Sequence, residues 1–167
     1  MADEPISAYR YPTTALLGDY ARAGIGLLFS LGPLGVTAPL PAVTGALGAL
    51  GALFLAYAGR TVIRHCTVIR LSDKAIEASG PLGTRIEWSE LRGYSLRYFS
   101  TKRDRTGGWM QLKLKARRRA LRIDSSIDGF DTILGDTARA ARQAGVVLDA
   151  NSAENLRARG IRPAFPE

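Results

Sequence analysis

The sequence predicts an α+β protein in which an N-terminal transmembrane helical hairpin precedes a small antiparallel β barrel capped by a C-terminal helix. Three observations support this fold class. Ala23–Gly59 is a run of 37 residues without charge, the residues after Arg60 form short alternating runs typical of strands, and the period becomes helical near Asp128. We expect four consecutive parts, a cytoplasmic segment 1–22, the hairpin 23–59, the β domain 60–150, and a short helix with a tail 151–167.

The charge-free stretch is too long for one membrane span of about 20 residues and is long enough for two short ones. Pro39 and Pro41 favour a turn near Thr37–Pro41, because each proline removes a backbone donor and disfavours helix in the preceding residue. Helices are therefore expected over Ala23–Val36 and Ala42–Ala58. A signal peptide fits poorly because the stretch starts late, and a buried soluble hairpin fits poorly because no polar stripe is present.

Arginines flank the charge-free stretch on both sides, whereas the predicted connecting loop has no charge. This pattern predicts a bacterial inner membrane protein with two spans and both termini in the cytoplasm. The second predicted helix also has a face of small residues suited to close helix packing. These residues are Gly45, Gly48, Ala49, Gly51, Ala52 and Ala56. The default interpretation is packing on the first helix, and the alternative is packing on a partner helix.

After Arg60 the chain alternates between short apolar runs and turn residues, which is typical of a meandering antiparallel sheet. Strands are predicted at Thr61–Leu71, Ala75–Ser79, Thr84–Trp88, Arg92–Phe99, Trp109–Lys115 and Arg119–Asp124. A short helical turn is expected at Trp88–Leu91, a helix over Asp128–Ala144 and a second helix over Ser152–Arg159. The order of strands and then helix indicates a strongly bent sheet or small barrel, closed at one end by the helix.

Several patterned positions resemble those of bacterial membrane proteins that carry a pleckstrin-homology-like domain. The resemblance depends on the hydrophobic hairpin, on Arg85–Leu91, on Ile127–Phe130 at the start of a helix, and on Gly145–Asp149 with Asn155 and Leu156. It covers most of the chain from Ala23 to Ile161. The resemblance implies a seven-stranded, partly open barrel capped by the C-terminal helix and used as a binding or assembly platform, with no catalytic residues to transfer.

Charge provides the strongest functional signal. Arg92–Arg122 contains 11 basic residues and one acid, Asp104, so an anionic surface is the expected neighbour. The candidate residues for binding lipid or a partner are Arg97, Lys102, Arg103, Arg105, Trp109, Lys113, Lys115, Arg117, Arg118, Arg119 and Arg122. Solubility and control of membrane topology are the alternative role for the charges. For Trp109 and Tyr98 the alternative to an interfacial role is packing within the sheet.

The remaining residues argue against catalysis. Cys66 is the only cysteine of the chain and His65 the only histidine. Adjacent residues of a strand point to opposite faces, so this pair does not predict a nucleophile and its base. No phosphate-binding glycine loop and no paired metal ligands occur, so neither a cofactor nor a metal is predicted. The aromatic and glycine signatures of nucleic-acid modules are also missing, which makes nucleic acid an unlikely partner.

Together these features predict a non-enzymatic, membrane-anchored binding or assembly module. Its basic cytoplasmic domain is expected to contact anionic phospholipid or an acidic protein surface. The alternative is a dedicated accessory subunit of a larger membrane protein complex, in which the Gly/Ala-rich hairpin packs against partner helices.

Overall fold

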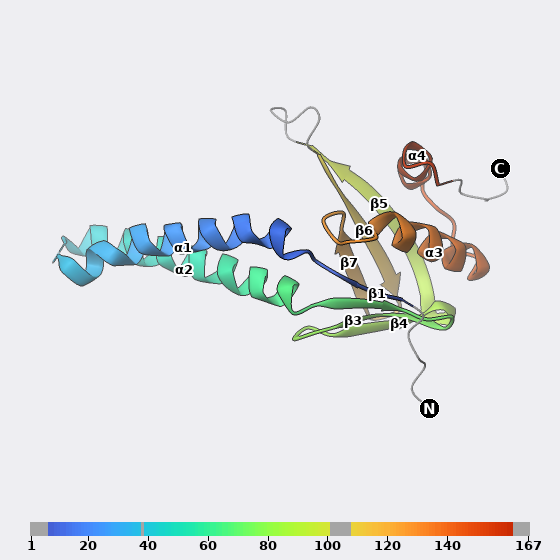
Figure 1. The fold of residues 1–167 in the computed structure, drawn as a ribbon, viewed down its shortest axis with the longest axis horizontal. Helices are drawn as coiled ribbons and strands as arrows, with labels where there is room; N and C mark the ends of the chain where they lie inside the picture. The colour runs from blue at the N-terminus through green and yellow to red at the C-terminus, as the bar shows by residue number, and fades with distance from the viewer. Residues whose placement is uncertain (1–6, 38, 101–107, 162–167) are drawn as a thin grey trace. The chain divides into compact units, whose positions relative to one another are not determined.

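The computed structural model of the protein describes residues 7–37, 39–100 and 108–161. It divides the chain into two compact units. One is helical and comprises Tyr11–Cys66; the other is formed by Met1–Arg10 together with Thr67–Glu167. The helical unit is therefore inserted between the first strand and the rest of the second unit (Figure 1).

The helical unit consists of α1 (Thr13–Val36) and α2 (Pro41–His65), which pack side by side (Figure 1). Small residues bring the two backbones together, because Gly26 lies against the ring of Phe54 and Gly51 lies against Leu31. A side chain larger than hydrogen at either glycine would overlap these neighbours. The close approach is therefore specified by glycine on each helix.

Both helices extend beyond the charge-free stretch. α1 begins at Thr13 instead of Ala23, and α2 continues to His65, so the start of the strand predicted at Thr61–Leu71 is helical. The reason is that charged side chains at these ends find partners within the unit. Asp19 accepts a hydrogen bond from the Tyr57 hydroxyl at 2.7 Å and pairs with Arg64 at 3.3 Å. The predicted helix boundaries, which were placed where charged residues begin, therefore made both helices too short.

The prediction of a transmembrane hairpin with two spans is wrong. Among the described residues, Pro41–His65 is the one helix long and apolar enough to cross a membrane. α1 does not qualify, because every stretch of 18 residues within it contains both Asp19 and Arg22, which lower its mean hydropathy. The 14 uncharged residues that α1 contributes, Ala23–Val36, are too few to compensate.

The second unit contains two open antiparallel sheets. The strands of the four-stranded sheet are, in spatial order, β1 (Ser7–Arg10), β2 (Val68–Leu71), β3 (Ala75–Ser79) and β4 (Thr84–Glu87). Those of the three-stranded sheet are β5 (Leu91–Phe99), β6 (Trp109–Ala116) and β7 (Ala120–Asp124). A short 3₁₀ turn, Trp88–Glu90, joins β4 to β5. Most of the strands predicted after Ser72 are confirmed, and β1 was not predicted.

The predicted barrel, and with it the resemblance to pleckstrin-homology-like membrane proteins, is wrong because the sheets stay separate and open. The outer edge of β5 carries α4 (Ala150–Ala158) where a closed barrel would need a further strand. Leu96 donates its backbone N–H to Ser152 Oγ at 2.8 Å, and Asn155 Nδ2 donates to the Leu96 carbonyl at 2.9 Å. Side chains of a helix thereby satisfy backbone groups that strand pairing would otherwise use.

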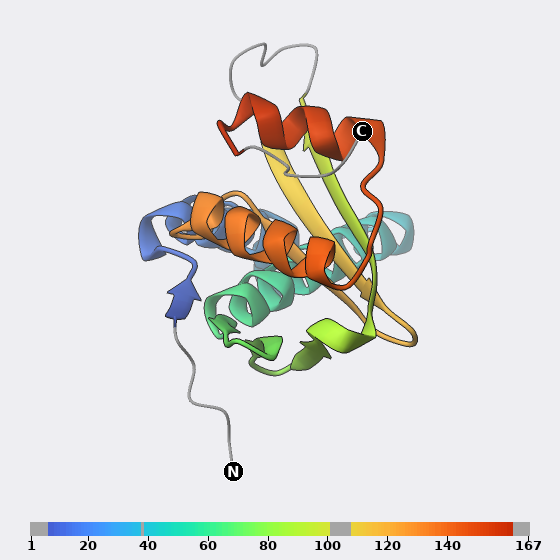
Figure 2. The ribbon, with the colours of Figure 1, turned by 90° about the vertical axis from the view of Figure 1, so that its right-hand side faces the viewer.

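The core of the second unit lies on one side of the three-stranded sheet. Leu96, Leu112 and Ile123 point inward and are fully buried, as are Ile133 and Leu134 of α3 (Phe130–Gln143). α3 and α4 both lie on this side (Figures 1 and 2). Because side chains alternate along a strand, the same three strands present their other residues on the opposite face.

Candidate functional site

The candidate site is the face of the β5–β6–β7 sheet that points away from the core, which we call the outer face. Alternation and strand register place eleven residues on it. They are Gly93, Ser95, Arg97, Phe99, Trp109, Gln111, Lys113, Lys115, Ala120, Arg122 and Asp124. Six residues separate Trp109 from Lys115, so the face extends for about 20 Å along β6.

The outer face gathers predicted binding residues from three strands. Lys113 of β6 lies directly opposite Arg122 of β7, and Lys115 follows two residues later on the same face. Arg97 of β5 lies opposite Gln111, the neighbour of Lys113 on that face. The sequence predicted a basic region, and the strand register turns part of it into one continuous cationic surface.

Electrostatics confirm that these cations are close neighbours. The charge of Lys115, then that of Arg122, then partial desolvation and finally the charge of Arg97 lower the pKa of Lys113 below its ordinary value. Like charges disfavour the protonated amine, so holding them together on the sheet is unfavourable. An anionic group on this face would relieve the repulsion.

Two acidic groups limit the positive charge at one margin of the face. Asp124 accepts a hydrogen bond from Gln111 Nε2 at 3.0 Å. Hydrogen bonds from the side chain and backbone of Ser152, and to a smaller extent the charge of Arg97, lower the pKa of Asp149, the N-cap of α4. The most strongly cationic part of the outer face is accordingly the group Lys113, Lys115 and Arg122.

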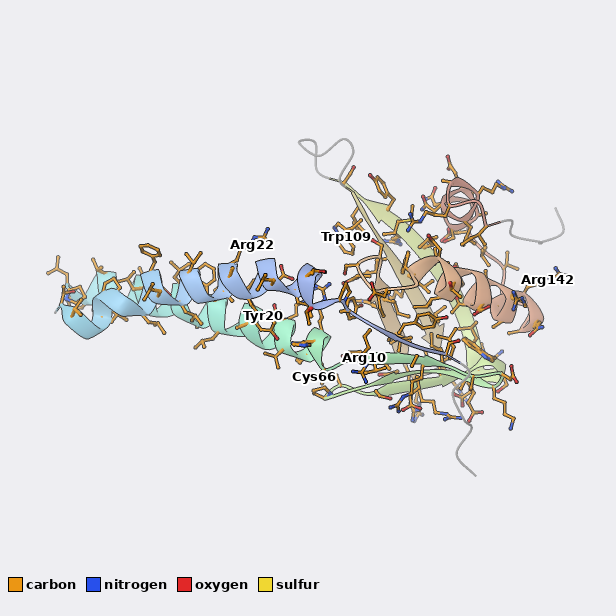
Figure 3. The ribbon with its side chains drawn as sticks, viewed as in Figure 1. Arg10, Tyr20, Arg22, Cys66, Trp109 and Arg142 are labelled. Atoms are coloured by element: carbon orange, nitrogen blue, oxygen red, sulfur yellow. The ribbon has the colours of Figure 1, made fainter. Side chains whose placement is uncertain are left out.

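An aromatic pair occupies the opposite end of the outer face. Phe99 and Trp109 are register partners, and their rings are stacked with centroids 4.7 Å apart and an interplanar angle of 21°. Phe99 is 39% exposed and Trp109 43% exposed. Trp109 lies on the side of the sheet away from α3 and α4 (Figure 3). Tyr98 has the opposite orientation in the strand alternation, so it does not belong to the outer face.

Three predicted residues lie at the β6–β7 turn beyond the cationic end of the outer face. Arg117, Arg118 and Arg119 are exposed, and the turn is closed by a hydrogen bond from the Ala116 N–H to the Arg119 carbonyl at 2.8 Å. Arg119 also donates to the Arg85 carbonyl at 3.2 Å. Lys102, Arg103 and Arg105 lie outside the described residues.

The small residues predicted for helix packing separate into two groups. Gly51 is buried against Leu31 of α1. Gly45 and Gly48 have no atom within 4 Å of the position that a Cβ would occupy. Ala49, Ala52 and Ala56 are exposed. The default interpretation, packing on α1, therefore holds for Gly51, and the other five do not form the α1–α2 contact at their Cβ positions.

A polar cluster in the helical unit was missed by the sequence analysis. Asp19 binds Tyr57, Arg22 and Arg64, and the Arg64 guanidinium lies 4.9 Å from the centroid of the Tyr11 ring. The sequence signal was Asp19 itself, a lone acid close to Arg22 at the edge of the apolar stretch. The cluster ties α1 to α2 and leaves the carboxylate satisfied by three donors.

Chemistry-bearing groups are sparse in the part of the chain that the structure describes. No group of three or more His, Cys, Asp and Glu residues there is arranged to hold a metal ion. Comparison of the chain with protein-family models, curated proteins and solved structures finds no match. The features of the described residues that bear on function are therefore the geometry of the outer face and the surface of the helical unit.

Proposed function

We propose that this protein is a non-enzymatic binding or assembly module that is attached to a membrane by its helical unit and contacts an anionic surface with its outer face. The observation that carries the proposal is the convergence of Lys113, Lys115 and Arg122 on one exposed sheet face. Mutual repulsion lowers the pKa of Lys113 on that face. A surface that gathers like charges on one face is suited to a negatively charged partner.

Membrane attachment is supported by the apolar surface of the helical unit. Only 6% of the most apolar stretch of 18 residues in α2 is buried inside the structure, whereas the core helix of a soluble protein is mostly buried. Large apolar side chains are exposed along both helices, namely Leu17, Ile25, Leu28, Phe29, Leu31, Val36, Val43, Leu50, Leu53, Leu55 and Val62. Contiguous apolar surface of this kind marks contact with a membrane or a partner.

Strand pairing supports a single-sided arrangement of the chain ends. β1 precedes the helical unit, β2 follows it, and the two strands pair from Ser7 with Leu71 to Arg10 with Val68. The two ends of the helical unit are therefore joined to adjacent strands of one sheet, which favours a location of both ends on the same side of the membrane. We assign this side to the cytoplasm of a bacterial inner membrane, because flanking arginines favour it.

The first experiment isolates the protein from its native membranes. The tagged full chain is extracted with a mild detergent, sized, and analysed by mass spectrometry for bound lipid and protein. The module predicts retention in membranes after an alkaline wash, which depends on the helical unit and should be the same in wild type and variants. It also predicts recovery with anionic lipid or one acidic protein, which K113E/R122E should reduce. The matched variant R142E/R157E changes the same charge on α3 and α4 and should retain them. Release by the alkaline wash, or identical recovery from both variants, would refute the proposal.

The accessory-subunit alternative uses the same surfaces with a different partner. Five small residues of α2 do not form the α1 contact at their Cβ positions. Their small size would allow a partner helix to approach closely, which favours this alternative. This alternative predicts a large complex of fixed stoichiometry in the sizing experiment. A small particle with bound lipid would instead favour an independent module.

A further inference from the structure

We infer that the outer face docks flat on the headgroup layer of a bilayer, with Phe99 and Trp109 in the interfacial zone and the Lys113, Lys115 and Arg122 side chains on anionic phospholipid headgroups. This inference deepens the proposed function, since it depends on the membrane attachment proposed above and selects lipid over an acidic protein as the partner of the face.

The outer face combines an aromatic end and a basic end along β6. Trp109 begins the strand at one end of the face, and Lys113 and Lys115 follow on the same side of the sheet. Aromatic rings are favoured at the membrane interface, and basic side chains are favoured beside anionic headgroups. One sheet face therefore combines both preferences within about 20 Å.

The aromatic pair of the outer face is partly exposed. Phe99 and Trp109 stack on each other yet keep 39% and 43% of their surface exposed. Met110, the next residue of β6 after Trp109, lies on the other side of the sheet and is half-buried, so the core contributes no cover to the pair. Because stacking already fixes the two rings, their insertion into the interfacial layer of a bilayer would cost little conformational entropy.

The outer face is open. Its three antiparallel strands have one irregularity of register, between Leu91 and Gly93, and two pockets of the second unit lie at its edges. One such pocket, of about 330 Å³, is lined by Arg97 and Phe99 on β5 and by Asp149 and Glu154 from the α4 segment. Its carboxylates would repel an anionic ligand there, so the anionic layer is expected over the Lys113 region.

The test measures the depth of Trp109 in a bilayer. The full chain and a W109F variant are reconstituted into vesicles of brominated phosphatidylcholine, with or without phosphatidylglycerol. The fluorescence lost by the wild type and not by W109F belongs to Trp109, because Trp88 is common to both proteins. Trp88 is held by a hydrogen bond from its Nε1 to the Ser72 carbonyl at 3.0 Å and serves as the internal reference.

We expect Trp109 to be quenched in vesicles that contain phosphatidylglycerol and to be far less quenched without it. Each basic residue near an anionic surface changes the docking equilibrium by about fivefold, so K113Q/R122Q should weaken docking by about thirtyfold. R142Q/R157Q removes two cations from α3 and α4 and should leave quenching unchanged. Arg142 lies on α3, on the other side of the sheet from Trp109 (Figure 3).

Three results would overturn the inference. Absence of Trp109 quenching in every lipid composition would remove lipid as the partner, and an acidic protein cross-linked to position 113 would then preserve the proposed function. Quenching that is indifferent to phosphatidylglycerol and to K113Q/R122Q would refute the role of anionic headgroups. Extraction of the wild-type chain from the vesicles by alkaline wash would instead refute the proposed membrane attachment itself.

Discussion

Replacement of Ser152 by alanine tests the contact that replaces strand pairing at the edge of β5. Ser152 is fully buried, and its Oγ accepts the Leu96 N–H at 2.8 Å. The substitution leaves a buried amide without an acceptor, which costs about 1–3 kcal/mol. The local free energy of opening at Leu96 should fall by this amount, so hydrogen exchange of its amide should accelerate by about 5-fold to 150-fold.

The assay is residue-resolved hydrogen exchange on the full chain in detergent, with Asn155→Ala as the matched control. Asn155 donates to the Leu96 carbonyl at 2.9 Å but is only half-buried, so water can replace it. We expect Asn155→Ala to cost about 0.5–1.5 kcal/mol and to leave the Leu96 amide more protected than Ser152→Ala does. Unchanged exchange at Leu96 in Ser152→Ala would refute the assignment of α4 as the cover of this edge.

Three further predictions concern single positions. Gly129 has φ +69° and lies against an aromatic ring, so Gly129→Ala should lower the free energy of unfolding by at least about 1 kcal/mol in a denaturant titration; an unchanged midpoint would contradict this. The pKa of Lys113 is lowered by neighbouring cations, so near pH 9 its amine should be acylated more slowly after Arg122→Gln, which raises that pKa; equal rates would argue against the cluster. Gly26→Leu should disrupt the α1–α2 contact, whereas Gly45→Leu should preserve it, as measured by disulfide trapping of engineered cysteines across the helices.

Local pattern predicted the elements of the second unit well. The alternation in Trp109–Lys115 identified β6 and its buried face, because Leu112 and Leu114 are apolar and Lys113 is not. The helical period after Asp128 likewise located α3. Such signals are local, since the residues that decide them are two to four positions apart. The basic character of the outer face followed from the same alternation.

Long-range pairing was beyond the sequence pattern. β1 has four residues and pairs with a strand that follows the whole helical unit, so nothing local identifies it. The barrel was predicted because several short strands are followed by a C-terminal helix. In the structure, Ser152 and Asn155 instead contact the edge of β5, at positions more than 50 residues away in the sequence. The Phe99–Trp109 stack also depends on register, which places the two rings opposite each other.

The boundaries of the helical unit show the same limit. Charge was treated as the end of each helix, but Asp19 and Arg64 lie within helices and pair with each other at 3.3 Å. A pair of opposite charges that meet in space cannot be read from positions 45 residues apart. For this reason the predicted helices were too short. The two-span hairpin was wrong because α1 includes Asp19 and Arg22.

The most direct test of the central claim is the protection of Lys113 in native membranes. Isolated membranes that contain the full chain are treated with an amine-reactive reagent, and modification of Lys113 is compared with that of Lys74, an exposed lysine in the β2–β3 turn, before and after detergent extraction. If the outer face contacts an anionic surface, Lys113 should be protected in membranes and become reactive once detergent removes its partner, while Lys74 stays reactive throughout. Equal reactivity of Lys113 in membranes and in detergent would contradict the claim.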